Sequence, residues 1–172
     1  MPPQIDLAAS RLCVKLFETN SAQSGDKRPA LYHSMRTPGR VGRESIEVVA
    51  SEIVDAAFRL HRGLGPGLLE SVYEVILARD LERRGLRVAR QVPISCEYDG
   101  LLFADVCRAD LLVEARVVVE IKSVERFAPV HPRQLLTYLR LLNLPLGLLV
   151  NFGAPTMKEG LRRVANGLPA SA

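Results

Sequence analysis

The hydrophobic and polar positions of the chain change their period near residue 85. Before that point apolar side chains recur at helical spacing. In 48–60 they line one face and predict a helix that begins near Ser45. A second helix is predicted from about Leu68 to Arg84. The glycine-rich stretch 63–67 between them lacks the Gly-Lys-Ser/Thr ending of a phosphate-binding loop, so we interpret it as a tight helix-to-helix turn.

After residue 85 the pattern becomes that of strands. Residues 86–98 alternate loosely, and Pro93 within them indicates an edge strand or a bulged strand. Asp99-Gly100 is a turn signal that predicts a hairpin into a strand at 101–106. Two more strands are predicted, one at 108–113 and one at 117–123, which makes the middle of the chain an antiparallel meander.

The last third returns to a mixed pattern. We expect a helix from about Pro132 to Leu142, then a buried strand within 144–152, because that short apolar run is bounded by Pro145 and Gly153. Residues Met157 to Val164 are predicted to form a basic helix. The resulting fold class is mixed α/β, with helices packed against one sheet.

The strand predicted at 117–123 carries two charged residues in an apolar stretch. Glu120 and Lys122 are two residues apart, so they share one face of the strand, whereas Val119 and Ile121 point to the other face, towards a core. If 114–116 form a three-residue hairpin loop, Asp110 of the preceding strand lies directly opposite Glu120. A two-residue loop would move Asp110 off that face.

Two opposed carboxylates destabilise a strand pair unless a further group compensates their charge. A hard divalent cation such as Mg²⁺ does so, because it prefers carboxylate oxygens and retained waters. Lys122 on the same face could orient or help deprotonate such a water, or stabilise charge that develops on a phosphate. The plainer alternative is a solvated strand face with a surface ion pair.

These residues resemble the PD-(D/E)xK nuclease signature, with Asp110 followed by Glu120-Ile121-Lys122. The run Gly67-Leu68-Leu69-Glu70-Ser71-Val72-Tyr73 resembles the GxxExxY motif that names one family of that superfamily. Segments 130–139 and 147–153 are similar to the same family, so the resemblance covers about 48–167.

The resemblance implies a PD-(D/E)xK core, a central mixed sheet flanked by helices, and a metal-dependent nuclease that hydrolyses DNA or RNA. It implies that Glu70, Asp110 and Glu120 hold Mg²⁺ or Mn²⁺. Lys122 would position the attacking water, and Gln134 would hydrogen-bond near Lys122 or the substrate phosphate.

Helical spacing places Glu70, Tyr73 and Glu74 on one stripe of the second helix. Periodicity alone favours a solvated edge with Tyr73 half buried. The resemblance instead turns Glu70 towards the site and makes Tyr73 a wall or substrate-positioning residue, while Glu74 is left on the surface.

Two further groups are candidates for substrate contacts. Gln134 and Tyr138 are four residues apart on one helical face, and RecB-like nucleases carry a similar Gln-x-x-x-Tyr pattern; ordinary surface decoration is the alternative. Arg162 and Arg163 could contact nucleic-acid phosphates or form a solvated basic face.

Composition narrows the picture only slightly. With 172 residues the chain has room for one domain, and a net charge of +4 permits a nucleic-acid partner without demanding one. The three cysteines show no CxxC pairing, so neither zinc nor a disulfide framework is indicated, and we expect a cytoplasmic setting. No apolar run is long enough to span a membrane.

The composition of the ends differs from that of the middle. Residues 1–44 have linker composition and are expected to be a disordered extension, with 45–168 as the domain and 169–172 as a tail. Met35 is a possible native start, which leaves open whether 1–34 are present in the native protein.

Alternatives to a nuclease remain at this stage. One is a nucleic-acid- or protein-binding module on a nuclease fold without catalysis. Another is a small oligomeric scaffold in which the acids form internal ion pairs. The sequence selects neither DNA nor RNA, neither endo- nor exo-cleavage, and no oligomeric state.

Overall fold

A computed structural model describes residues 45–167, and the expectations for 1–44 and 169–172 lie outside this range. The described part contains three helices and five strands. In chain order they are α3 (Ile46–Leu64), α4 (Glu70–Arg83), β1 (Val88–Tyr98), β2 (Leu101–Val113), β3 (Val117–Lys122), α5 (Val130–Leu141), β4 (Leu146–Asn151) and β5 (Leu161–Ala165).

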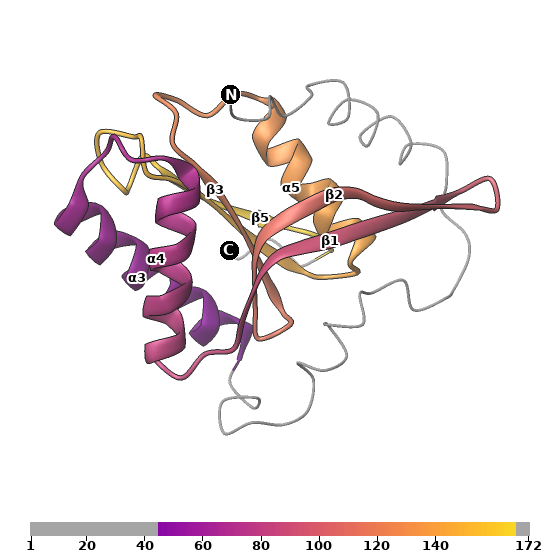
Figure 1. Ribbon diagram of the computed structural model, residues 1–172, viewed down its shortest axis with the longest axis horizontal. Helices are drawn as coiled ribbons and strands as arrows, with labels where there is room; N and C mark the ends of the chain where they lie inside the picture. Colours follow the sequence, from indigo (N-terminus) through magenta and orange to yellow (C-terminus); the bar gives the residue numbers. More distant parts are fainter. Residues whose placement is uncertain (1–44, 168–172) are drawn as a thin grey trace.

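The five strands form one sheet in the order β1-β2-β3-β4-β5 (Figure 1). Strands β3 and β4 are parallel and the other neighbours are antiparallel, which confirms the mixed sheet expected from the sequence. The central strand β3 is buried along its whole length. A charged pair placed on it is therefore held rigidly and away from bulk solvent.

Helices cover both faces of the sheet (Figure 1). Helices α3 and α4 pack on one face with alternate β3 residues, among them Val119 and Ile121, as the strand period predicts. Helix α5 packs on the other face, where Leu135 and Leu139 meet Val118 of β3. Glu120 and Lys122 share the parity of Val118, so they lie on the α5 face.

The first helix starts where expected, because Ser45 is its N-cap and its hydroxyl accepts a hydrogen bond from the Val48 amide. It ends at Gly65, whose φ of 68° lies in the left-handed region that glycine adopts without steric cost.

The hairpin between β2 and β3 has the predicted register. Its loop is 114–116, and Leu111 pairs with Val119 while Val113 pairs with Val117. Glu114 and Ala115 both adopt positive φ angles, which lets three residues reverse the chain. Asp110 and Glu120 are consequently the next opposed positions beyond the last paired residues.

The stretches predicted as separate strands at 101–106 and 108–113 form one continuous strand, β2. Only 111–113 of it pair with β3, so the rest of β2 and its partner β1 extend from the body as a two-stranded arm (Figure 1). Asp105 lies inside β2 with a φ of 51°, beside a register shift between Ile94 and Cys96. This bulge adds twist to the arm.

The predicted basic helix at Met157 to Val164 is wrong. Residues 153–160 form turns, and Leu161–Ala165 pair antiparallel with β4 as strand β5. Backbone N–H and C=O groups along the edge of β4 form hydrogen bonds with this segment. These hydrogen bonds stabilise the strand more than the short helical pattern of apolar residues stabilises a helix. Gly160 passes so close to Asn151 that a Cβ would overlap the Asn151 carbonyl.

Within residues 45–167, no helix is both long enough and apolar enough to cross a membrane.

Candidate active site

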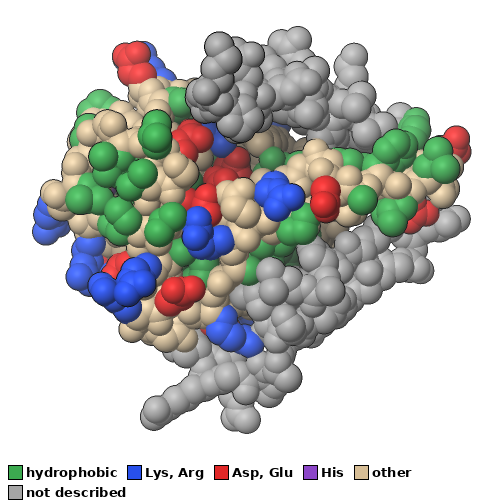
Figure 2. Space-filling model, viewed as in Figure 1, with side chains coloured by type: hydrophobic (Ala, Val, Ile, Leu, Met, Phe, Trp, Pro, Cys, Tyr) green, Lys and Arg blue, Asp and Glu red, His purple; other side chains and the backbone are tan. Residues whose placement is uncertain are grey.

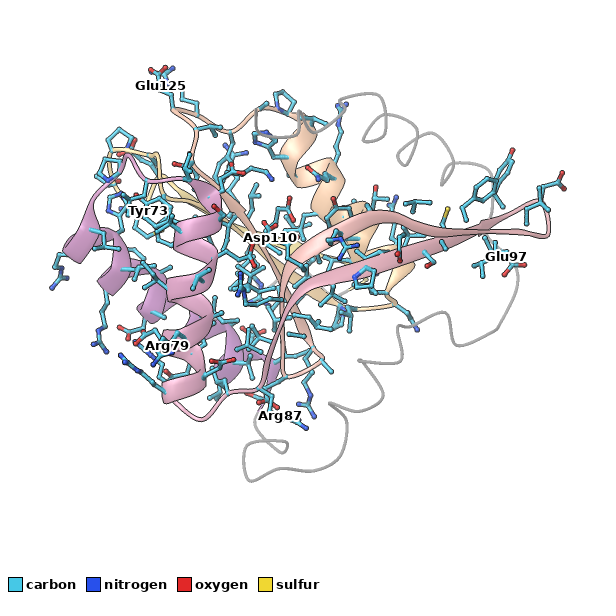
Figure 3. The ribbon with its side chains drawn as sticks, viewed as in Figure 1. Tyr73, Arg79, Arg87, Glu97, Asp110 and Glu125 are labelled. Atoms are coloured by element: carbon cyan, nitrogen blue, oxygen red, sulfur yellow. The ribbon has the colours of Figure 1, made fainter. Side chains whose placement is uncertain are left out.

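The candidate site lies where β2 separates from β3. The backbone ladder between the two strands ends at Leu111 and Val119. Beyond it, Asp110 Oδ2 accepts a hydrogen bond of 2.7 Å from the Ile121 amide, so a side chain replaces the next ladder partner. Figure 3 shows Asp110 at this fork, between α4 and the base of the arm. The carboxylate therefore has a fixed position relative to β3.

Glu120 and Lys122 form a close pair on the α5 face of β3. The Lys122 ammonium donates to Glu120 Oε1 at 2.6 Å. Only 3% of Glu120 is exposed, and Lys122 is also buried. The second oxygen, Glu120 Oε2, is buried and has no hydrogen-bond partner among the described residues. Such an oxygen is costly in a folded protein unless a further group binds it.

The carboxylates of the site raise one another's affinity for protons. Burial, followed by the neighbouring Asp110 charge, raises the pKa of Glu120 to about 8, against the lowering effect of Lys122. Burial also raises the pKa of Asp110 to about 6, although the Ile121 amide and Lys122 lower it. Such shifts mark a place that holds more negative charge than its surroundings compensate.

Lys122 shows the complementary effect. Burial alone would lower the pKa of its ammonium, but the attraction of Glu120, Asp110 and Glu70 outweighs it and raises the pKa. Lys122 is therefore a cation at neutral pH.

Glu70 reaches the end of β3 from the first turn of α4. Its Oε1 accepts a hydrogen bond of 2.9 Å from the Ser123 amide, and the Ser123 hydroxyl donates to the Leu68 carbonyl at 2.7 Å. These contacts fasten the start of α4 to the strand that carries the acidic pair. The charge of Glu70 raises the pKa values of both Asp110 and Glu120, so the three acids act as one electrostatic cluster.

The acidic side chains of the site can be compared with the ligands that a divalent metal ion prefers. Among residues 45–167 no three His, Cys, Asp or Glu side chains are grouped so that they would hold a metal ion by themselves. Asp110 and Glu120 nevertheless offer two opposed carboxylates with an unpaired buried oxygen, Glu120 Oε2. Mg²⁺ commonly binds through one or two carboxylates while it keeps several waters and substrate oxygens. The residues therefore fit a divalent ion of that kind.

Sequence reasoning placed Glu74 on the surface, and this is wrong. Glu74 is buried, pairs with Arg90 Nε at 2.9 Å and accepts from Gln91 Nε2 at 2.6 Å. The same amide nitrogen lies 3.4 Å from Asp110 Oδ1, so Gln91 bridges the two acids. The helical period could not show this, because strand β1 covers that side of α4.

Gln91 is a site residue that sequence reasoning missed. It adopts a φ of 50° and faces Asp110 in the register between β1 and β2, in the gap between the pairs Arg90–Leu111 and Val92–Ala109. The position opposite Asp110 identifies Gln91 as a site residue, but only when the register between β1 and β2 is known.

Helix α5 covers the site with one face. Tyr138 is buried, and desolvation together with the Glu120 charge raises the pKa of its hydroxyl. Gln134 Nε2 donates to Tyr138 Oη at 2.5 Å, whereas the sequence led us to expect a hydrogen bond near Lys122 or to the substrate phosphate. The Gln134 amide and the Tyr138 hydroxyl are therefore joined by a hydrogen bond on the face of α5 that covers the site.

His131 belongs to the same face and was also missed. Its Nδ1 accepts a hydrogen bond of 3.2 Å from the Ala128 amide, which leaves the proton of the neutral ring on Nε2. Burial and the Lys122 charge lower its pKa, so the ring is neutral at pH 7. His131, Gln134 and Tyr138 recur at helical spacing, which is the signal that could have found it.

Tyr73 was expected to be half buried or to line the site, and the structure places it in the core. Its ring stacks on Phe152 with centroids 4.3 Å apart, and the Leu68 amide donates to its hydroxyl, which itself bonds the Gly65 carbonyl. Tyr73 therefore braces the turn before α4 and has no exposed surface for a substrate.

The two candidate arginines separate because they alternate on β5. Arg163 forms two hydrogen bonds of 2.6 Å with Glu47 at the start of α3. The Arg162 guanidinium lies 5.3 Å from the centre of the Phe127 ring, and Phe127 meets His131 edge-on. Only Arg162 is thus connected to the face that carries the site.

Two of three comparisons with known proteins found a match. The profile of the family described as the PD-(D/E)XK nuclease superfamily matches residues 47–164. A search of curated proteins gave no match. Among solved structures, the crystal structure of SSO0001 matches with a TM-score of 0.47 and 19% identity, over 98% of this chain and 81% of that chain.

Proposed function

This chain belongs to the PD-(D/E)XK nuclease superfamily, and from that premise we propose that it is a metal-dependent nuclease that hydrolyses phosphodiester bonds of DNA or RNA. The observation that carries the proposal is the buried Glu120 oxygen, beside Asp110 and Lys122, that has no hydrogen-bond partner within residues 45–167. We further assign the chain to the GxxExxY family on the run from Gly67 to Tyr73.

Asp110 and Glu120 would hold Mg²⁺ or Mn²⁺, with Glu70 as a third acid at the edge of the cluster. A divalent ion bound there would polarise the scissile phosphate and generate a nucleophilic water at neutral pH. Glu120, with a pKa of about 8, carries a proton in much of the population at pH 7 and must release it to become a ligand.

Lys122 would act as a cation and not as a base. The raised pKa of its ammonium keeps it protonated, so it is suited to stabilise charge on the attacking water or on the phosphate oxygens. Its present partner is Glu120 Oε1. When Glu120 turns both oxygens to a ligand, the ammonium becomes available to the substrate.

Helix α5 would supply neutral polar groups on the substrate side. Tyr138 stays protonated, and the Gln134 amide fixes the orientation of its hydroxyl. His131, neutral with its proton on Nε2, can donate a hydrogen bond to a phosphate oxygen. Arg162 on Phe127 is the nearest candidate for a contact with the nucleic-acid backbone.

The test begins with metal binding, measured by calorimetry with Mg²⁺ and Mn²⁺ on the wild type and on Glu120→Gln. Glu125→Gln is the matched control, because Glu125 is an exposed glutamate in the loop after β3, away from the labelled Asp110 (Figure 3). The proposal expects binding in the wild type and the control, and loss in Glu120→Gln.

The second step is cleavage of labelled single-stranded DNA, duplex DNA, RNA and branched DNA with each metal. Cleavage that requires metal and Glu120 supports the nuclease. Binding of nucleic acid without cleavage, and with no difference between wild type and Glu120→Gln, would overturn it in favour of a non-catalytic binding module on the same fold.

A further inference from the structure

The arm formed by residues 95–106 of β1 and β2 carries an exposed apolar tip. Leu101 is 64% exposed, Leu102 is 73% exposed, and Phe103 beside them is exposed as well. Only 111–113 of β2 pair with β3, so the sheet does not cover the tip (Figure 1). Large apolar side chains gathered on a protruding hairpin favour a partner surface.

The charge of the arm argues against nucleic acid as that partner. No lysine or arginine occurs from Gln91 to Cys107, while Glu97, Asp99 and Asp105 are exposed. Nucleic-acid backbones are bound mainly through lysine and arginine, and acidic residues repel them. The arm therefore fits a protein surface that is apolar and positively charged.

Helix α4 of the same chain presents such a surface. Leu69 is 73% exposed, and Leu68, Val72 and Val75 are exposed next to it. Arg79 follows Val75 by four residues and Arg83 follows Arg79 by four, so both arginines continue the same helical stripe and are exposed. We call Leu68, Leu69, Val72, Val75, Arg79 and Arg83 the α4 stripe.

The arm tip and the α4 stripe lie at opposite ends of the molecule. Figure 3 places Glu97 on the arm and Arg79 on α4 far apart, and in Figure 2 hydrophobic side chains gather over the helices and again at the arm. Both gatherings show on the same face. A single chain cannot bring its own arm to its own α4 stripe without breaking the sheet, whereas a second copy can.

We propose that the protein forms a two-fold symmetric dimer in which the arm tip of each copy docks on the α4 stripe of the other. Apolar residues meet apolar residues, and the acidic arm meets Arg79 and Arg83. The two-fold axis repeats the contact, so both patches of both copies are buried and the assembly closes at two. One such contact is small, and the repeat doubles the buried area towards the size of stable interfaces.

Light scattering coupled to gel filtration, over a wide range of protein concentration, measures the association. The arm variant is Leu101→Asp with Leu102→Asp. The stripe variant is Leu69→Asp with Val75→Asp, and aspartate at Leu69 also suits the N-cap position of α4. Val48→Asp on α3 is the control, because Val48 is a similarly exposed apolar residue outside both patches.

The wild type and the control are expected to be dimers, and each variant is expected to associate at least about tenfold more weakly, because aspartate loses the apolar burial and places a charge in the contact. Circular dichroism confirms that each variant is folded. High salt is expected to weaken the wild-type dimer, because acidic and basic groups face each other.

Mixing the two variants decides how the copies meet. A mixed pair keeps one intact contact, between the arm of the stripe variant and the α4 stripe of the arm variant, so association is expected to return in part. A mixture that stays monomeric would overturn the proposal, and a stripe variant that dimerises by itself as strongly as the wild type would overturn it in favour of an arm-to-arm contact. A monomeric wild type, or oligomers that keep growing with concentration, would also overturn it. Metal binding by the arm variant is expected to match the wild type, because Leu101 and Leu102 lie outside the acidic cluster, so failure of the dimer and failure of the nuclease proposal are distinguishable.

Discussion

A glutamate is buried at each end of the β2–β3 hairpin, and the two carboxylates differ in how many of their oxygens have hydrogen-bond partners. At the loop end, Glu114 accepts hydrogen bonds from the Arg87 amide at 2.6 Å, from Nε at 3.0 Å and from Nη2 at 2.6 Å. At the open end, Glu120 shares one oxygen with Lys122 and leaves the other without a partner among the described residues. Both side chains are almost fully buried.

The difference separates a structural carboxylate from one that is poised to bind. The Arg87 guanidinium donates to Glu114 Oε2 and the Arg87 backbone amide donates to Oε1, so both oxygens are satisfied and that end is complete without a ligand. At Glu120 burial, and after it the negative charge of the neighbouring Asp110, raise the pKa to about 8. A buried carboxylate with spare oxygen and excess negative charge is a cation site.

The largest expected effect is the loss of catalytic rate when Glu120 loses its charge. Glu120→Gln keeps the shape of the side chain and removes its charge, so metal-dependent cleavage of nucleic acid should fall roughly a thousandfold. Initial rates at saturating metal measure it. Glu125→Gln should keep wild-type rates, and a variant Glu120→Gln that cleaves normally would remove Glu120 from the site.

Stability should change in opposite directions at the two ends. Glu114→Ala removes the buried carboxylate that accepts hydrogen bonds from both the Arg87 amide and its guanidinium, and should cost about 3 kcal/mol of unfolding free energy. Glu120→Gln removes an incompletely paired charge and should leave the metal-free protein as stable as the wild type or more so. Urea unfolding at pH 7.5, a condition chosen near the pKa of Glu120, compares the two. A Glu120→Gln protein destabilised as strongly as Glu114→Ala would contradict the distinction.

Metal-free stability should fall as the pH rises from about 5 to about 8. In the folded state Glu120 keeps its proton up to a pKa of about 8, whereas in the unfolded chain it loses the proton near the ordinary glutamate pKa of 4.5. The folded state therefore binds more protons in this window, and its stability decreases with pH. Thermal melts across this range should show a smaller decrease for Glu120→Gln. Saturating Mg²⁺ should raise the melting temperature most at the upper end, because the ionised form binds it.

The smallest effects should separate the two arginines of β5. Arg163→Gln breaks an exposed pair with Glu47 and should change the unfolding free energy by less than about 1 kcal/mol, without an effect on substrate binding. Arg162→Gln should weaken nucleic-acid binding a few-fold and lower its salt dependence. Fluorescence anisotropy with a labelled oligonucleotide at two salt concentrations measures both variants. Equal effects of the two substitutions would show that Arg162 has no special role.

Rules that depend only on residues close in sequence correctly predicted the β2–β3 hairpin that carries the site. Alternation along 117–122 and the length of the 114–116 loop were enough to oppose Asp110 and Glu120, since both depend on residues close in sequence. The same rules found the three helices, whereas the mixed sheet was expected from the family resemblance. They failed at β5, where a short basic run was taken for a helix, because pairing with the edge of β4 decided its conformation.

The sequence by itself determined which residues share a strand face, where the chain turns, and that the acids oppose each other. Only the tertiary structure decided how those charges are completed. It buried Glu74 against Arg90 and Gln91, connected Gln91 to Asp110, put Tyr73 in the core and brought His131 to the site. The reason is physical: alternation and helical period act over a few residues, whereas burial and charge depend on which distant elements pack together.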